Sequence, residues 1–209
     1  MEIILIRHAQ SKGNKQNIVQ GHSDQGLSDL GKEQANQFAK SFNKDINAIY
    51  SSDTGRAVET ATPLAEKLGL KIHTDSELRE ANFGKWEGLT YDEVKKLYPL
   101  EYESWHKNYH IRPEWFESFE SHFLRIKSAI SKVLANHNLN DRIAIFTHGG
   151  SIKTQIGHFN NLSGEELTNF TNSNCSMTLL RFNPSKDYEH GKTVYYNRDI
   201  INTAAQKEL

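Results

Sequence analysis

Short apolar runs alternate with amphipathic stretches along most of the chain. The apolar runs are rich in β-branched and aliphatic residues, as buried strands are, and they cover residues 3–6, 46–50, 70–73 and 142–146. Between and after them, apolar side chains recur at helical spacing, which predicts helices over residues 33–42, 55–68, 114–136 and 151–159. Two late segments alternate and are rich in Thr and Tyr, which is typical of edge strands, at residues 176–182 and 193–196.

Strands that alternate with helices predict an α/β fold. We expect a three-layer sandwich with a mostly parallel central sheet, helices on both faces and an antiparallel edge strand. A single domain over residues 1–209 is expected, because this length builds one core. From residue 90 the pattern is helical with interruptions at Pro99 and Pro113. We therefore expect residues 84–125 to form a small helical cap over the C-terminal ends of the strands.

Composition and charge exclude several classes of protein. The formal net charge of 209 residues is −1, so no global field attracts nucleic acid or an anionic membrane. No segment approaches the roughly 18 to 20 apolar residues of a membrane span. Cys175 is the only cysteine, which excludes an internal disulfide and agrees with a reducing compartment. We expect a soluble, cytoplasmic protein; its oligomeric state stays open, a homodimer included.

The histidines do not predict a metal site. None of the ten pairs at a known metal-ligand spacing, so no metal and no cofactor are expected. We interpret His22, His106, His110 and His122 as surface or substrate-side residues. The aromatic residues of the expected cap are interpreted as core positions rather than as a pocket lining.

Charged and polar residues follow three of the predicted strands. Arg7 and His8 end the first run, the segment 53–56 follows the second, and His148 and Gly149 follow the fourth. Because parallel neighbouring strands end at one edge of a sheet, these groups are expected to meet there.

Such a set suits the transfer of a phosphoryl group. Arg7 and Arg56 can fork onto its nonbridging oxygens. One neutral histidine could attack phosphorus, since cationic neighbours lower its pKa, and a second, protonated histidine would donate to the oxygens in transfer. Glu80, which follows a short strand and precedes Gly84, is the candidate general acid for the leaving oxygen.

Several motifs, in order, resemble one family. Arg7-His8-x-x-Ser11-x-x-Asn14 resembles the RHGxTxxN signature of the histidine phosphatase superfamily, also called phosphoglycerate mutase-like. Residues 21–31, 51–61 and 147–150 are similar to its GxxDxPLTxxG, SDLxRAxQTA and second-histidine motifs. Residues 78–88 look most like the phosphatase branch that includes α-ribazole and broad-specificity phosphatases.

The resemblance implies roles for individual residues. It makes His8 the phosphohistidine nucleophile and Glu80 the proton donor. Arg7, Arg56 and His148 would form the phosphate pocket. The substrate-binding residues that it implies are Asn14, Gln20, Gly21 and Gly149.

Two departures from the family pattern bear on activity. Ala9 replaces the glycine after the nucleophilic histidine and, at a positive φ, would cost on the order of 1 kcal/mol. Tyr91 stands where the mutase branch places a substrate-binding lysine, which argues against a mutase. The resemblance therefore predicts a metal-independent phosphatase whose partner is a small phosphorylated metabolite. The alternatives are phosphoglycerate mutase-type phosphoryl transfer and a catalytically silent phosphate-binding or scaffold protein.

Overall fold

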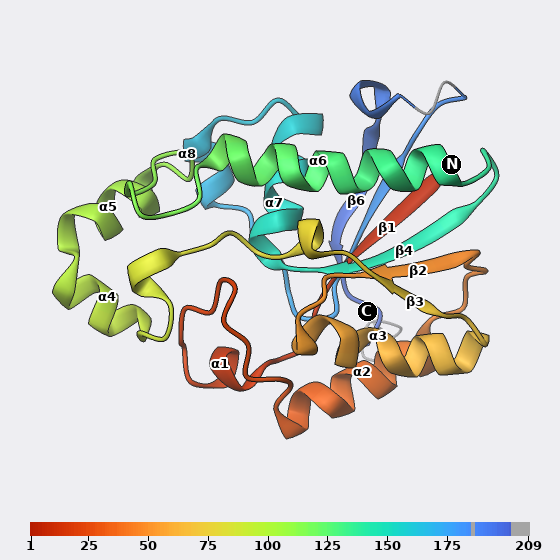
Figure 1. Ribbon diagram of the computed structural model, residues 1–209, viewed down its shortest axis with the longest axis horizontal. Helices are drawn as coiled ribbons and strands as arrows, with labels where there is room; N and C mark the ends of the chain where they lie inside the picture. The colour runs from red at the N-terminus through yellow and green to blue at the C-terminus, as the bar shows by residue number, and fades with distance from the viewer. Residues whose placement is uncertain (185–186, 202–209) are drawn as a thin grey trace, which may run out of the picture.

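A computed structural model describes residues 1–184 and 187–201, which form a six-stranded mixed sheet flanked by helices (Figure 1). The strand order is β3-β2-β4-β1-β5-β6. The strands are β1 (Glu2–Arg7), β2 (Ala48–Ser51), β3 (Ile72–Thr74), β4 (Arg142–Thr147), β5 (Met177–Arg181) and β6 (Lys192–Arg198). The neighbours from β3 to β1 pair in parallel, whereas β5 pairs antiparallel with both β1 and β6. The predicted fold class is confirmed.

Helices cover both faces because the strands bury both faces. On β1, Ile3 and Leu5 point into one core, whereas Ile4 and Ile6 point into the other. The first core is covered by α6 (Phe119–Asn136) and α7 (Gly149–Phe159), and the second by α2 (Asp29–Ser41) and α3 (Gly55–Leu68). Figure 1 shows these pairs on opposite sides of the sheet.

The start of α6 differs from the predicted helix over residues 114–136. The helix begins at Phe119 because Ser118 caps it: its Oγ accepts a hydrogen bond from the Ser121 N–H at 3.0 Å. The preceding residues turn instead, with the Phe116 N–H donating to the Pro113 carbonyl at 2.9 Å. Two short helices, α1 (Lys12–Lys15) and α8 (Gly164–Thr168), were not predicted, because each is about one turn long and shows no helical periodicity.

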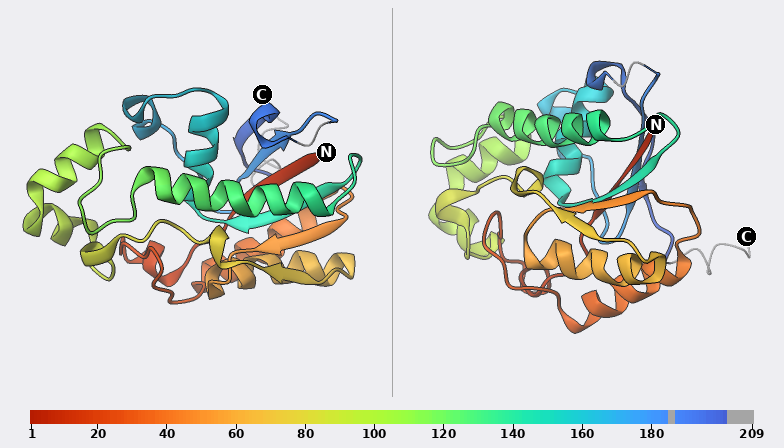
Figure 2. Two further views of the ribbon diagram at one scale, coloured as in Figure 1. Left: turned by 45° about the horizontal axis from the view of Figure 1, so that its top comes forward. Right: turned by 45° about the vertical axis from the view of Figure 1, so that its right-hand side comes forward.

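The segment expected to form a cap has its own small core. It contains the 3₁₀ turn η2 (Gly84–Trp86) and the helices α4 (Tyr91–Leu97) and α5 (Pro99–Lys107), which lie beyond the end of the sheet (Figure 2). Trp86, Val94 and Phe116 are buried together there. Partly buried aromatic side chains pack around them, namely Phe83, Tyr98, Tyr102, Trp105 and Trp115. Trp86, Tyr98, Tyr102 and Trp115 are packed side chains, as interpreted, whereas Tyr91, Trp105 and Tyr109 also line the cavity at the ends of the strands, which corrects the interpretation for these three. The division of the chain into a domain and a cap stays a prediction.

Two further 3₁₀ turns complete the described elements, η1 (Ser76–Leu78) and η3 (Tyr188–His190). The turn η1 lies between β3 and the segment that carries Glu80. Across the described ranges, no helix combines the length and apolarity needed to traverse a bilayer.

Candidate active site

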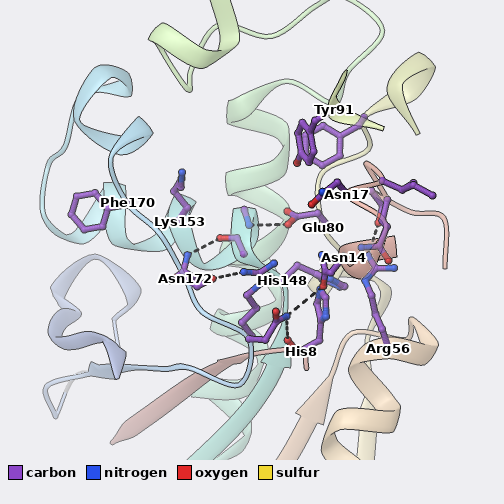
Figure 3. A pocket seen from close by; sticks show the side chains of 18 of the residues that line it. His8, Asn14, Asn17, Arg56, Glu80, Tyr91, His148, Lys153, Phe170 and Asn172 are labelled. Carbon is purple, nitrogen blue, oxygen red and sulfur yellow. Dashed lines mark hydrogen bonds between the residues drawn. The ribbon is translucent and has the colours of Figure 1, made fainter. Parts of the chain in front are cut away.

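A cavity of about 420 Å³ opens at the carboxyl ends of β1, β2 and β4 (Figure 3). Every residue that the sequence predicts for the site lines it. They are Arg7, His8, Asn14, Gln20, Gly21, Arg56, Glu80, His148 and Gly149. Their convergence follows from the parallel register, in which Arg7 lies opposite Thr147 and the two strands end together.

His8 is held in one tautomer by the backbone. Its Nδ1 lies 2.7 Å from the carbonyl oxygen of Ala9, and since a carbonyl only accepts, Nδ1 carries the proton. In the neutral ring, Nε2 therefore keeps its lone pair. Burial, followed by the charges of Arg56 and Arg7, holds the pKa of His8 well below its usual range, so the ring is neutral at pH 7. His8 thus has an unprotonated nitrogen available for attack.

Ala9 is not strained. The φ angle of Ala9 is not positive. An alanine in place of the family's glycine therefore carries no cost in backbone strain. The methyl group is buried in the core beneath the sheet. The Ala9 N–H donates to Oγ1 of Thr60 at 2.9 Å, which ties the loop after β1 to α3.

Arg56 holds the loop that contains Gly21 and Ser23 in place across the cavity from His8. Its guanidinium is 1% exposed and donates to the carbonyls of Gly21 and Ser23 at 2.7 Å each. It also pairs with Asp24 at 3.2 Å. The carbonyl of Gly21 is therefore engaged by Arg56. A side chain at Gly21 would overlap the carboxylate of Glu87, and its φ of 52° is in the left-handed region, so glycine is required there.

Both arginines keep donors for an anion. Arg7 donates through one terminal nitrogen to the carbonyl of Asn172. The Nε atoms of Arg7 and Arg56 are buried without a partner among the described residues. Burial lowers the pKa of both groups, yet a guanidinium stays protonated in proteins. Two cations, Arg56 buried and Arg7 partly buried, therefore face the same cavity as His8 with unused N–H groups.

His148 lies at the end of β4 and edge-on to His8, with ring centroids 5.2 Å apart. Its Nε2 lies 2.9 Å from Oγ of Ser52, and Nδ1 is buried without a partner in the described chain. We predicted a protonated ring, but burial and Arg56 hold the pKa of His148 well below its usual range. The ring is neutral at pH 7 in the free protein, because burial and the neighbouring cationic groups both lower its pKa. A bound phosphate dianion would oppose that shift.

Glu80 reaches the cavity from the segment after η1. Its side chain is 13% exposed. Oε2 accepts from the N–H of Gly150 at 2.8 Å, and Oε1 accepts from the N–H of Ala81 at 3.0 Å. Arg125 on α6 donates to the carbonyl of Glu80 at 3.1 Å. Both the backbone carbonyl and the carboxyl group of Glu80 thus accept hydrogen bonds from other residues.

The side-chain amides of Asn14 and Gln20 make fewer hydrogen bonds to the protein than the groups described above. Oδ1 of Asn14 accepts from the Ser11 N–H at 3.2 Å, as part of the capping box of α1, and lies 3.4 Å from Nδ2 of Asn174. Oε1 of Gln20 is buried without a partner among the described residues. Both side chains can turn amide groups toward a ligand.

Sequence reasoning missed several residues that line the cavity, among them Lys153, Asn172 and Asn174. Lys153 lies one helical turn after Gly149 on α7, so the two residues share one face of the helix. This spacing is the signal in the sequence that could have placed Lys153 at the cavity. Burial lowers its pKa to about 8. Its Nζ lies 4.7 Å from the ring of Tyr109, and no ion pair is found for it in the described ranges. Asn172 and Asn174 are in the loop before β5, where no pattern marks them.

The position of His122 contradicts another prediction. It was interpreted as a surface or substrate-side residue, but it is completely buried on the inner face of α6. Its ring lies beside Ser151 and Glu80. The interpretation holds for His106 and His110, which are exposed, whereas His22 is half-buried and donates from Nε2 to the carbonyl of Glu80 at 3.0 Å.

The described part of the chain contains no group of three His, Cys, Asp or Glu side chains placed to share a metal ion. The cavity instead places a neutral imidazole, two guanidinium groups, a second imidazole and a carboxyl group around one space. This is an arrangement for binding an anion next to a nucleophile.

Comparison with known proteins agrees. Residues 3–192 match the histidine phosphatase superfamily (branch 1). Phosphoglycerate mutase-like protein 4 from Arabidopsis thaliana is 36% identical over 158 residues, 73% of this chain and 68% of that protein. Phosphoserine phosphatase 1 from Hydrogenobacter thermophilus is 29% identical over 177 residues, 84% of this chain and 82% of that protein. The solved structure of Bacillus stearothermophilus YhfR has a TM-score of 0.88 at 26% identity and covers 96% of this chain and 99% of that chain.

The chain therefore belongs to the histidine phosphatase superfamily, branch 1. The family predicted from the motifs is confirmed, and so is the enzyme class, a phosphoric monoester hydrolase. The chemical role of each residue in the cavity stays a prediction.

Proposed function

We propose that the protein hydrolyses a small phosphomonoester through a phosphohistidine on His8, without a metal ion. The hydrogen bond from Nδ1 of His8 to the carbonyl of Ala9 carries this proposal, because it leaves the lone pair of Nε2 unprotonated beside two guanidinium groups. A buried imidazole in that setting is neutral and nucleophilic at pH 7.

In the first step, Nε2 of His8 attacks phosphorus and the bond from phosphorus to the leaving oxygen breaks. Glu80 gives its proton to that oxygen as it leaves. In the second step, the carboxylate of Glu80 takes a proton from water, and the water oxygen attacks phosphorus. The bond between phosphorus and Nε2 breaks, which releases inorganic phosphate and restores His8.

Side chains with N–H groups stabilise the negative charge of the phosphoryl group that is transferred. Arg7 and Arg56 supply N–H groups to its nonbridging oxygens, and His148 supplies a further ring N–H. Bidentate guanidinium contacts stabilise the three equatorial oxygens in the manner that a bound cation would. We therefore expect activity to persist in EDTA.

The wall around the leaving group indicates the kind of substrate. Lys153 and Phe170 lie on one side of the cavity and Tyr91 on the other (Figure 3). Lys153 is the one lining cation beyond Arg7 and Arg56 among the described residues. A single extra cation suits a leaving group with one carboxylate better than a second phosphoryl group, which a mutase must hold. The alternative of a silent scaffold loses its main support, because Ala9 is unstrained.

The test is the replacement His8→Ala, assayed on 4-nitrophenyl phosphate and with radioactive substrate. We expect hydrolysis to fall to background, and an acid-labile, base-stable label to be lost from the protein. The exposed His106→Ala is the matched control and should keep both. Unchanged turnover in His8→Ala, or inhibition of the wild type by EDTA, would refute the corresponding part of the proposal.

A further inference from the structure

His122 lies against the carboxyl group of Glu80 but takes no part in the steps above. Its Nε2 is 3.8 Å from Oε1 of Glu80. The ring is 0% exposed and does not line the cavity. His122 therefore cannot touch a substrate, and any effect on the reaction must pass through Glu80.

The hydrogen bonds around His122 determine which ring nitrogen carries its proton. The hydroxyl of Ser151 donates its single hydrogen to the carbonyl of Arg79 at 3.0 Å. Oγ of Ser151 must then accept from His122 Nε2, which lies 3.0 Å away. Burial and the charges of Arg112 and Arg125 hold the pKa of His122 well below its usual range. The ring is consequently neutral, with its only N–H on the side of Ser151 and Glu80.

The second ring nitrogen of His122, Nδ1, indicates that the histidine does more than stabilise the fold. Nδ1 of His122 is buried without a partner in the described chain. A buried nitrogen without a partner destabilises the folded state, and an apolar side chain of similar size avoids that cost. What a histidine adds at this position is the N–H beside the carboxyl group of Glu80.

The backbone of Glu80 is already fixed by another residue of α6. Arg125, one turn after His122, donates to the carbonyls of Glu77 at 2.7 Å, Arg79 at 2.9 Å and Glu80 at 3.1 Å. An ion pair with Glu117 at 2.7 Å orients that guanidinium. What Arg125 leaves undetermined is the orientation of the Glu80 carboxyl group about its own side-chain bonds.

We propose that His122 is a positioning residue for the general acid, on the basis of the proposed function of Glu80. Oε1 accepts from the N–H of Ala81 and Oε2 from that of Gly150, while the ring N–H of His122, which donates to Ser151, lies 3.8 Å from Oε1 and adds a positive dipole on that side alone. Oε2 thus keeps a lone-pair site that can carry the proton for the leaving oxygen. When that proton has been transferred, the two backbone N–H groups and the nearby N–H dipole of His122 stabilise the carboxylate.

The test uses leaving-group dependence, which a purely structural role would not change. A nitrophenolate leaves without a proton, whereas the alkoxide of glycerol 2-phosphate needs one. The constant to compare is kcat/KM, since it reports formation of the phosphoenzyme and not its hydrolysis. The variants are His122→Leu, which removes the N–H, His122→Gln, whose amide can occupy the position of Nε2, and His122→Asn, whose amide cannot.

We expect kcat/KM of His122→Leu for glycerol 2-phosphate to fall by about tenfold, with a change of less than about threefold for 4-nitrophenyl phosphate. His122→Asn should behave like His122→Leu, and serves in its place should that variant not fold. His122→Gln should recover most of the loss. Equal losses on both substrates, or none on either, would overturn the proposal.

Glu80→Gln separates this inference from the proposed function. We expect it to show the same selectivity with a larger loss on glycerol 2-phosphate, of about a hundredfold. Should Glu80→Gln be selective while His122→Leu is not, only the role of His122 is wrong. Should Glu80→Gln lower kcat/KM equally for both substrates, the assignment of Glu80 as the general acid is wrong.

Discussion

The amide N–H of Gly150 donates to Oε2 of Glu80 at 2.8 Å, across 70 positions of sequence. The first turn of α7 thus follows His148 directly and also holds the proposed acid. The proposed phosphate-binding residue His148 and the proposed proton donor Glu80 are consequently joined through one short stretch of backbone. A substitution in this turn should therefore reduce proton donation by Glu80 more than it reduces the stability of the fold.

Gly150→Ala tests that relationship. An added Cβ would overlap the carboxyl group of Glu80 and lie 2.7 Å from the hydroxyl of Tyr109. Because the carboxyl group is the end of a flexible side chain, it should move and lose its alignment. We expect kcat/KM for an alkyl phosphate to fall by about tenfold or more, with a smaller loss on 4-nitrophenyl phosphate. Unchanged activity on the alkyl phosphate would show that Gly150 does not position Glu80.

Ala9→Gly tests whether the departure from the family pattern limits the enzyme. Ala9 has no positive φ and its methyl group is buried, so glycine adds backbone entropy to the unfolded chain and removes packing. We expect the free energy of unfolding in urea to drop by about 1–2 kcal/mol. Activity on 4-nitrophenyl phosphate should not rise. A clear gain in kcat would mean that the alanine does restrict the nucleophile loop.

The sequence predicted which residues at the strand ends line the cavity, for a physical reason. His8 and His148 each follow a short buried run, and parallel strands end at one edge. Their positions depended on the strand register alone. Cap residues such as Trp86, Tyr98 and Tyr102 were likewise predicted as core, because aromatic side chains at helical spacing usually pack inward.

The remaining part of the site depends on packing between elements, which no local pattern encodes. Lys153 enters the cavity because α7 turns one face toward it, and Asn172 does so from an irregular loop. His122 was misplaced because a polar residue on an amphipathic helix is usually exposed. Its burial is determined by Ser151 on a different helix, which supplies the partner.

Three buried histidines should make stability depend on pH. His8, His122 and His148 have pKa values well below the ordinary 6.5, so below that pH the unfolded chain binds more protons than the folded chain. Their neutral burial is fully compatible with folding above about pH 6.5, and stability should fall as the pH drops below it. The loss is up to about 1.4 kcal/mol per pH unit for each ring.

Urea unfolding between pH 7 and pH 5 measures this slope. His122→Leu removes one of the three rings and should flatten the slope by up to about 1.4 kcal/mol per pH unit. The exposed His106→Ala is the matched control and should keep the slope of the wild type. An unchanged slope in His122→Leu would mean that this ring takes up a proton in the folded state as readily as in the unfolded chain.

Lys153 should give the enzyme a preference for leaving groups with a carboxylate, and a pH limit on that preference. Its pKa of about 8 means that it is cationic at pH 7 and neutral at pH 9. For phosphoserine, we expect Lys153→Met to raise KM by about tenfold at pH 7, since a charge-assisted contact is lost. Phenyl phosphate has no such group and should show little change.

The pH dependence provides the sharper measurement. In the wild type, KM for phosphoserine should rise as the pH passes 8, because Lys153 loses its charge while the phosphate stays a dianion. Lys153→Met should show a high KM without that rise, and Lys153→Arg should keep a low KM through pH 9 because a guanidinium stays charged. Parallel profiles for all three proteins would place the carboxylate away from α7.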